Sequence, residues 1–120
     1  MSLTRSTRAL HSRWQVLQLC VRCALNVAQA GYVRQYLSCG IKLARMGAMD
    51  ERDVQLRMLQ TLLRTARDEA LPWFWRSVCL EHTSLPLARL HSLVARHDPV
   101  AMRAIEAAVQ RGRDELPAPY

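Results

Sequence analysis

Residues 50–71, DERDVQLRMLQTLLRTARDEAL, decide the fold of this chain. Asp50 is a typical N-cap residue, because its carboxylate can accept a hydrogen bond from the first helical turn, and Pro72 ends the pattern. Between them the apolar residues recur at steps of three and four, as on one side of a helix. This stripe consists of Leu56, Leu59, Leu63, Ala66 and Ala70. We therefore expect an amphipathic helix over residues 51–70.

The same period continues toward the N-terminus and predicts two more helices. Over residues 8–30 the stripe is Leu10, Trp14, Leu17, Val21, Ala24 and Ala28. Gly31 should end this helix, because glycine is common just beyond helix C-termini. Over residues 32–46 the apolar residues are Val33, Tyr36, Leu37, Ile41 and Leu43. Three antiparallel helices joined by short connections would bury all three stripes.

The chain beyond residue 71 predicts a helical extension. The cluster Trp73, Phe74 and Trp75 has either of two roles, a latch that closes the bundle or a docking anchor together with Arg76, since Trp and Arg are common at interface hot spots. Further helices are expected over residues 86–96 and 99–111, followed by a proline-containing tail at 116–120. The predicted fold is all-α: an antiparallel three-helix bundle (1–71) with a C-terminal helical docking extension (72–120), forming one domain overall.

Composition excludes several classes of protein. With 120 residues, half of them apolar, the chain can bury a modest core but not a two-domain enzyme with its own cofactor fold. Four glycines and no alternating β-branched runs argue against a sandwich, a barrel or a dinucleotide-binding fold. No uninterrupted apolar run is long enough for a transmembrane helix, so the chain is expected to be at most peripheral to a membrane.

The basic charge is concentrated in the first 49 residues. The net charge is +7, and the first acidic residue is Asp50. The seven basic residues before it are Arg5, Arg8, Arg13, Arg22, Arg34, Lys42 and Arg45. Such a one-sided field attracts an anionic partner, either an acidic protein, nucleic acid or a membrane surface. The acid-free, Arg- and Ser-containing start also fits a mitochondrial presequence, although the apolar period from Leu10 favours a helix of the mature protein.

The sequence offers little for catalysis or metal binding. The acids fall at helix starts and solvent-facing positions, and the histidines have no matching nucleophile, so no enzyme is expected. Cys20, Cys23, Cys79 and His82 are of zinc-binding residue types, which gives a zinc-stabilised module as an alternative. The first pair lies within a predicted helix, so we expect no metal site and no cofactor belonging to the chain itself.

Residues 14–22, WQVLQLCVR, resemble the opening of the LYR-motif proteins of mitochondria, small proteins with three helices. Leu19 and Arg22 match the Leu-Tyr-Lys-Arg form of the motif, while Cys20 stands where the family has tyrosine. The order of elements also agrees over residues 10–71, except that Leu43 occupies the place of a family phenylalanine. The C-terminal extension makes the chain most similar to the accessory subunits of respiratory complex I.

The resemblance implies a non-catalytic subunit of a mitochondrial respiratory complex, on the matrix side of the inner membrane, in contact with other subunits. Family members bind the acidic mitochondrial acyl carrier protein, whose acyl-phosphopantetheine arm enters a tunnel between the helices. The implied carrier-binding residues are Arg22, Arg34, Lys42 and Arg45. The implied tunnel residues are Leu17, Val21, Ala24, Leu37, Ile41 and Leu59. No direct contact with nucleic acid is expected; the alternatives are an assembly factor and an RNA-binding protein associated with mitochondrial ribosomes.

Overall fold

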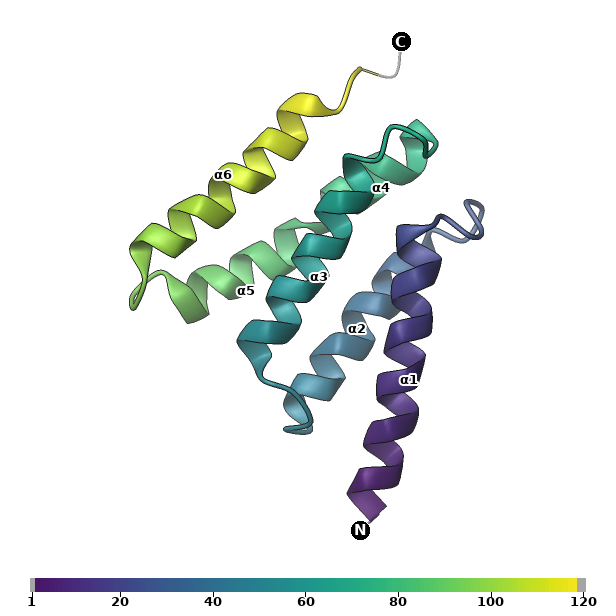
Figure 1. Cartoon of the computed structure of the whole chain (residues 1–120), viewed down its shortest axis with the longest axis vertical. Coiled ribbons are helices and arrows are strands. Elements are labelled where there is room, and N and C mark those ends of the chain that lie inside the picture. Colours follow the sequence, from purple (N-terminus) through teal and green to yellow (C-terminus); the bar gives the residue numbers. More distant parts are fainter. Residues whose placement is uncertain (1, 119–120) are drawn as a thin grey trace.

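The computed structural model describes residues 2–118, and within this range the chain forms six α-helices and no strand (Figure 1). They are α1 (Ser2–Arg22), α2 (Gly31–Arg45), α3 (Glu51–Ala66), α4 (Trp73–His82), α5 (Ser84–Val94) and α6 (Pro99–Glu115). The prediction of an all-helical chain is confirmed. Across residues 2–118 none of these helices combines the length and the apolar character needed to cross a membrane.

The first helix ends eight residues earlier than predicted. After Arg22 the amides of Ala24 and Leu25 bond back to the carbonyls of Val21 and Cys20, and Ala24 adopts a left-handed conformation with φ of 48°. This pair of bonds is a Schellman motif, which terminates a helix. Gly31, predicted to end the first helix, instead begins α2 after a connection of turns.

The later helices begin close to the predicted positions. Asp50 caps α3 by accepting a hydrogen bond from the Asp53 amide (3.3 Å), and Asp98 caps α6 by accepting one from the Ala101 amide (3.0 Å). The aromatic cluster after Pro72 forms the first turn of α4. Trp73 donates a hydrogen bond to the carbonyl of Pro117 (2.6 Å), which holds the start of the tail; residues 119–120 of the predicted tail lie outside the described residues.

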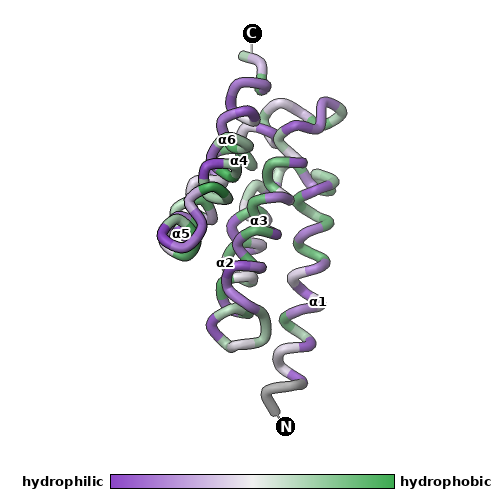
Figure 2. Tube along the Cα trace, turned by 60° about the vertical axis from the view of Figure 1, so that its left-hand side comes forward, coloured by the Kyte–Doolittle hydropathy of each residue, from purple (hydrophilic) through white to green (hydrophobic). Residues whose placement is uncertain are grey.

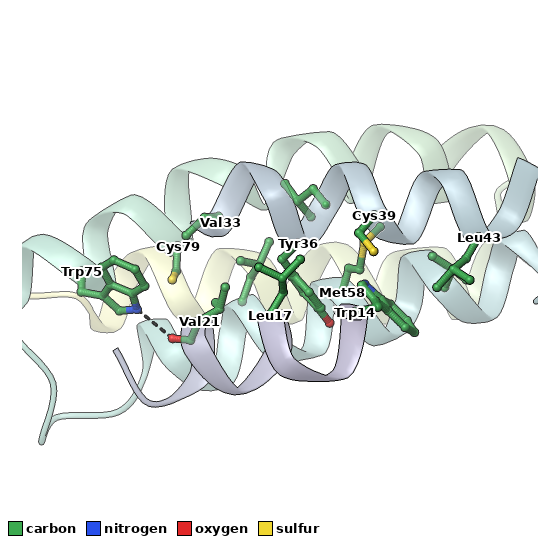
Figure 3. Close-up of a cluster of buried hydrophobic side chains, with 13 residues drawn as sticks. Trp14, Leu17, Val21, Val33, Tyr36, Cys39, Leu43, Met58, Trp75 and Cys79 are labelled. Atoms are coloured by element: carbon green, nitrogen blue, oxygen red, sulfur yellow. Dashed lines mark hydrogen bonds between the residues drawn. The ribbon is translucent and has the colours of Figure 1, made fainter. Parts of the chain in front are cut away.

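A first core cluster fills the space where α1, α2 and α3 meet (Figure 3). At its centre the rings of Trp14 and Tyr36 stack with centroids 5.6 Å apart, and the guanidinium of Arg57 covers the Trp14 ring at 5.1 Å. Burial raises the pKa of Tyr36 to about 12, and its hydroxyl bonds to Thr61 (3.1 Å). Trp75 and Cys79 of α4 extend the same cluster.

A second core cluster joins α3 to α5 and α6. It contains Leu59 from α3, Leu90 and Val94 from α5, and Met102 and Val109 from α6. Because α3 contributes to both clusters, it lies in the middle of a flat molecule of 53 × 37 × 16 Å (Figure 2). The predicted boundary at residue 71 does not separate the two clusters, since α4 packs in the first and α3 in both.

Candidate functional site

A mainly apolar depression of the surface lies between α2 and the corner where α4 meets α5. One part, of about 440 Å³, is bounded by α2, α3 and α5, and a second part, of about 490 Å³, by α2 and the α4–α5 corner. Leu37, Ile41 and Leu85 line both parts, so the two parts adjoin, and together we call them the α2–α5 trough. Volumes of this size are typical of sites for small or chain-like ligands.

The floor of the trough is mainly apolar, because the buried side chains that α2 and α3 turn toward it are apolar except for Gln55. Leu37 and Met58 are 3% and 1% exposed and form the floor, with half-buried Ile41 and Ala44 beside them. Leu85 of α5 forms the wall and remains 59% exposed. An apolar chain lying here would cover the exposed part of the Leu85 side chain, and burial of this apolar surface would favour binding.

The rim of the trough is basic along α2. Arg34 borders one part, Arg45 borders the other, and both are exposed, as is the neighbouring Lys42. The spacing of 34, 38, 41 and 45 places the two arginines on one face of the helix together with Ser38 and Ile41. Three of the four predicted carrier-binding residues therefore lie on the exposed side of α2.

Opposite this face, the rim carries an ion pair between Glu51 of α3 and Arg89 of α5. The hydrogen bond from Arg89 holds the pKa of Glu51 below its usual value and raises that of Arg89, and nearby Arg45 adds to the lowering. The pair bridges the helices that form this wall. Sequence reasoning missed both the pair and Leu85; the i, i+4 spacing of Leu85 and Arg89 on one helix was the available signal.

The fourth predicted carrier-binding residue lies elsewhere. Arg22, at the end of α1, forms an ion pair with Asp68 (2.8 Å), and this hydrogen bond lowers the pKa of Asp68. Both side chains line a separate, open and mainly polar depression next to the end of α3. Arg22 thus holds the α1 and α3 ends together and does not belong to the α2 face.

The six predicted tunnel residues do not surround one cavity. Leu17 and Val21 are buried in the first core cluster, and Leu59 is buried in the second. Ala24 lies in the connection after α1, so only Leu37 and Ile41 line the trough. The reason is steric: the large rings of Trp14 and Tyr36 occupy the middle of the first cluster (Figure 3).

The predicted docking residues also divide. Trp75 is fully buried and donates a hydrogen bond to the carbonyl of Val21 (2.8 Å), so it closes the core as a latch and offers no docking surface (Figure 3). Arg76 is buried as well, and its guanidinium bonds to the carbonyl of Ala66 (2.8 Å). The docking role predicted for Trp75 and Arg76 is therefore corrected, because both side chains are buried. Trp73 is half-buried against the tail, and Phe74 is 53% exposed.

The cysteines and His82 are not gathered into a metal site. Cys79 lies in the core, where burial raises its pKa to about 12, and His82 bonds to the carbonyl of Val78 (2.8 Å). Cys20 is half-buried at the end of α1, and Cys23 is exposed just after it. Among residues 2–118 no group of three or more His, Cys, Asp or Glu residues is placed to hold a metal ion.

The α2–α5 trough therefore combines a mainly apolar floor with a rim that is basic along α2 and carries Glu51 and Glu81 on its other sides. The α2 side suits non-covalent binding of an anionic group that carries an apolar chain. Comparisons with protein-family models, with curated proteins and with solved structures gave no match.

Proposed function

We propose that this chain is a non-catalytic interaction subunit that binds an acidic carrier protein through α2 and receives the carrier's apolar arm in the α2–α5 trough. One observation carries the proposal: Arg34 and Arg45 stand exposed on the rim of a trough whose floor is mainly apolar. The surrounding segment supports it, because residues 1–49 carry seven basic residues and no acidic one. Such a field speeds and orients the approach of an acidic partner.

The resemblance to LYR-motif proteins supplies the identity of the partner. It implies the mitochondrial acyl carrier protein with its acyl-phosphopantetheine arm, and an accessory subunit of a complex I-like respiratory assembly on the matrix side of the inner membrane. The three-helix bundle with an extension is the architecture that goes with this proposal. The trough replaces the tunnel between the helices as the place of the acyl chain, because the bundle interior is filled by the chain's own side chains.

Calorimetric titration of the full chain with acyl carrier protein tests the proposal. The acylated carrier should bind more tightly than the apo carrier that lacks the arm, because only the former buries apolar surface in the trough. The variant Arg34→Glu/Arg45→Glu should weaken binding of both carriers by about tenfold or more. Arg103→Glu/Arg111→Glu, an equal charge change at two exposed positions of α6, serves as the matched control.

A second variant separates the arm from the carrier surface. Leu85→Asp should remove the advantage of the acylated carrier and leave binding of the apo carrier unchanged, and the exposure of Leu85 lets this variant fold. The proposal fails if neither carrier binds, or if Arg34→Glu/Arg45→Glu behaves like Arg103→Glu/Arg111→Glu. Binding of single-stranded RNA that Arg34→Glu/Arg45→Glu abolishes, without carrier binding, would favour the RNA-binding alternative.

A further inference from the structure

The outward side of α1 carries an apolar stripe that no other part of the described chain covers. Val16 and Leu19 are each 59% exposed, and Cys23, one turn further on, is exposed too. Continuing the same steps of three and four toward the N-terminus gives Ser12, Arg8 and Arg5, which are also exposed. We call these residues the α1 outer face: Arg5, Arg8, Ser12, Val16, Leu19 and Cys23.

This face has a definite polarity along the helix. Its C-terminal half is apolar, and its N-terminal half is cationic because Arg5 and Arg8 lie there. The positive end of the helix dipole reinforces the charge at that end. No acidic residue occurs in α1 or α2, so nothing on either helix neutralises the face. A complementary surface must therefore be apolar at one end and acidic at the other.

The α1 outer face is separate from the α2–α5 trough. The residues that line the two parts of the trough belong to α2, α3, α4 and α5, and none of them belongs to α1. In both whole-chain views α1 forms one edge of the molecule, and its N-terminal turns reach past the α2–α3 connection (Figures 1 and 2). A second partner can reach this face while the trough is occupied.

We propose that the α1 outer face docks an acidic amphipathic helix of a second protein, so that the chain bridges two partners. The partner helix lies along α1 with its apolar side over Val16 and Leu19 and its carboxylates over Arg5 and Arg8. A stripe one residue wide with steps of three and four is the pattern that one helix presents to another.

Two other occupants fit the face less well. A second copy of the chain would bring an identical acid-free segment against it, and like charges oppose that contact. Helices that lie in a membrane surface carry large aromatic and leucine side chains on the apolar side. Among the described side chains of α1, Trp14 is the one tryptophan, tyrosine or phenylalanine, and it is fully buried in the core. The charge and the narrow stripe together favour a single acidic helix.

Fluorescence anisotropy of a labelled synthetic peptide tests this docking. The peptide repeats leucine at helical steps of three and four with glutamate elsewhere, and a peptide of the same composition in scrambled order is its control. The intact chain should bind the first peptide and not the second. Val16→Ser/Leu19→Ser should weaken binding by about tenfold or more, because two buried contacts are lost. Arg34→Glu/Arg45→Glu, which changes the trough rim, should leave binding within about twofold, a difference too small to indicate a lost contact.

The native thiol of Cys23 gives a second readout that needs no substitution. Cys23 is exposed, whereas Cys39 and Cys79 are buried, so alkylation followed by mass spectrometry can follow Cys23 separately. Bound peptide should slow its alkylation. The proposal is overturned if the peptide does not bind, if Val16→Ser/Leu19→Ser binds it as well as the unchanged chain, or if Cys23 stays equally reactive. Self-association through Val16 and Leu19, or stripe-dependent binding to vesicles of equal phosphatidylcholine and phosphatidylserine without peptide binding, also overturns it.

Discussion

At the scale of single residues, Gly40 is where α2 comes closest to its neighbours. A Cβ added there would lie 2.5 Å from Met58 Sδ and 2.9 Å from Trp14 Nε1. Neither side chain can retreat, because Met58 and Trp14 are 1% and 0% exposed and Trp14 is stacked on Tyr36. We therefore expect Gly40→Ala to lower the free energy of unfolding by about 1–3 kcal/mol, despite the better helix propensity of alanine. Denaturation with urea measures this change.

Gly31 is the matched control for this substitution. It also lies in α2, yet a Cβ built on it would meet no atom within 4 Å. Gly31→Ala should be neutral or stabilising by up to about 1 kcal/mol, the difference in helix propensity. Equal effects of the two substitutions would show that the α1–α2–α3 contact is looser than described.

Residue types alone predicted burial better than they predicted neighbours. The stripes correctly placed Leu17, Val21, Leu37 and Leu59 inside, because an apolar period needs only one buried side. They did not reveal that Trp14 and Tyr36 would fill the bundle interior, since ring stacking depends on how the helices are rotated. For the same reason Trp75, whose indole reaches Val21 across 54 positions of sequence, was assignable either to the core or to a partner.

At the scale of elements, α1 and α2 end in the same motif with different residues. The left-handed position is Ala24 after α1 (φ 48°) and Gly47 after α2 (φ 72°). In each case the amide of the left-handed residue and the amide of the residue after it donate to carbonyls of the last turn, as Ala48 does to the carbonyl of Leu43. A left-handed conformation costs a residue with a Cβ roughly 1–2 kcal/mol. Ala24→Gly should therefore raise the free energy of unfolding by about 1 kcal/mol, and Gly47→Ala should lower it by a similar amount.

Thermal unfolding followed by circular dichroism measures both substitutions on the same scale. The signs make the test sharp, because a general effect of glycine on the unfolded chain would give the reverse result: Ala24→Gly would lower the free energy of unfolding and Gly47→Ala would raise it. If Ala24→Gly destabilises the protein, the connection after α1 does not end the helix in this way.

The way each helix end is capped explains which ends could be predicted. Asp50 and Asp98 carry their capping chemistry in the side chain, so the starts of α3 and α6 were readable from sequence. The end of α1 was not, because an alanine in the left-handed region gives no sequence signal. The α2 side of the trough followed from periodicity, whereas its α5 wall depends on where α5 packs, which the local pattern does not encode.

At the scale of the whole molecule, the excess of positive charge makes its few ion pairs matter in acid. Arg89 and Arg22 donate hydrogen bonds that hold the pKa values of Glu51 and Asp68 below their ordinary values of 4.5 and 3.8. A carboxylate whose pKa is lower in the folded than in the unfolded state stabilises the fold above the unfolded pKa. That contribution disappears as the pH falls through the folded pKa. The stability should therefore decline below about pH 4.5, while the net charge rises from +7 as carboxylates are protonated.

The variant Glu51→Gln/Asp68→Asn separates the two causes of this decline. In the variant the basic residues still repel one another as the pH falls. The two ion pairs are already absent at every pH, so acid removes nothing further there. The variant should therefore lose less stability than the unchanged chain over the same pH range. Glu106→Gln, at an exposed position of α6, should follow the unchanged chain closely. Urea denaturation at a series of pH values and constant ionic strength makes the comparison. Parallel curves for all three proteins would mean that the bridges from Glu51 to Arg89 and from Asp68 to Arg22 do not hold the helices together in solution, and that acid acts on this chain through its overall charge alone.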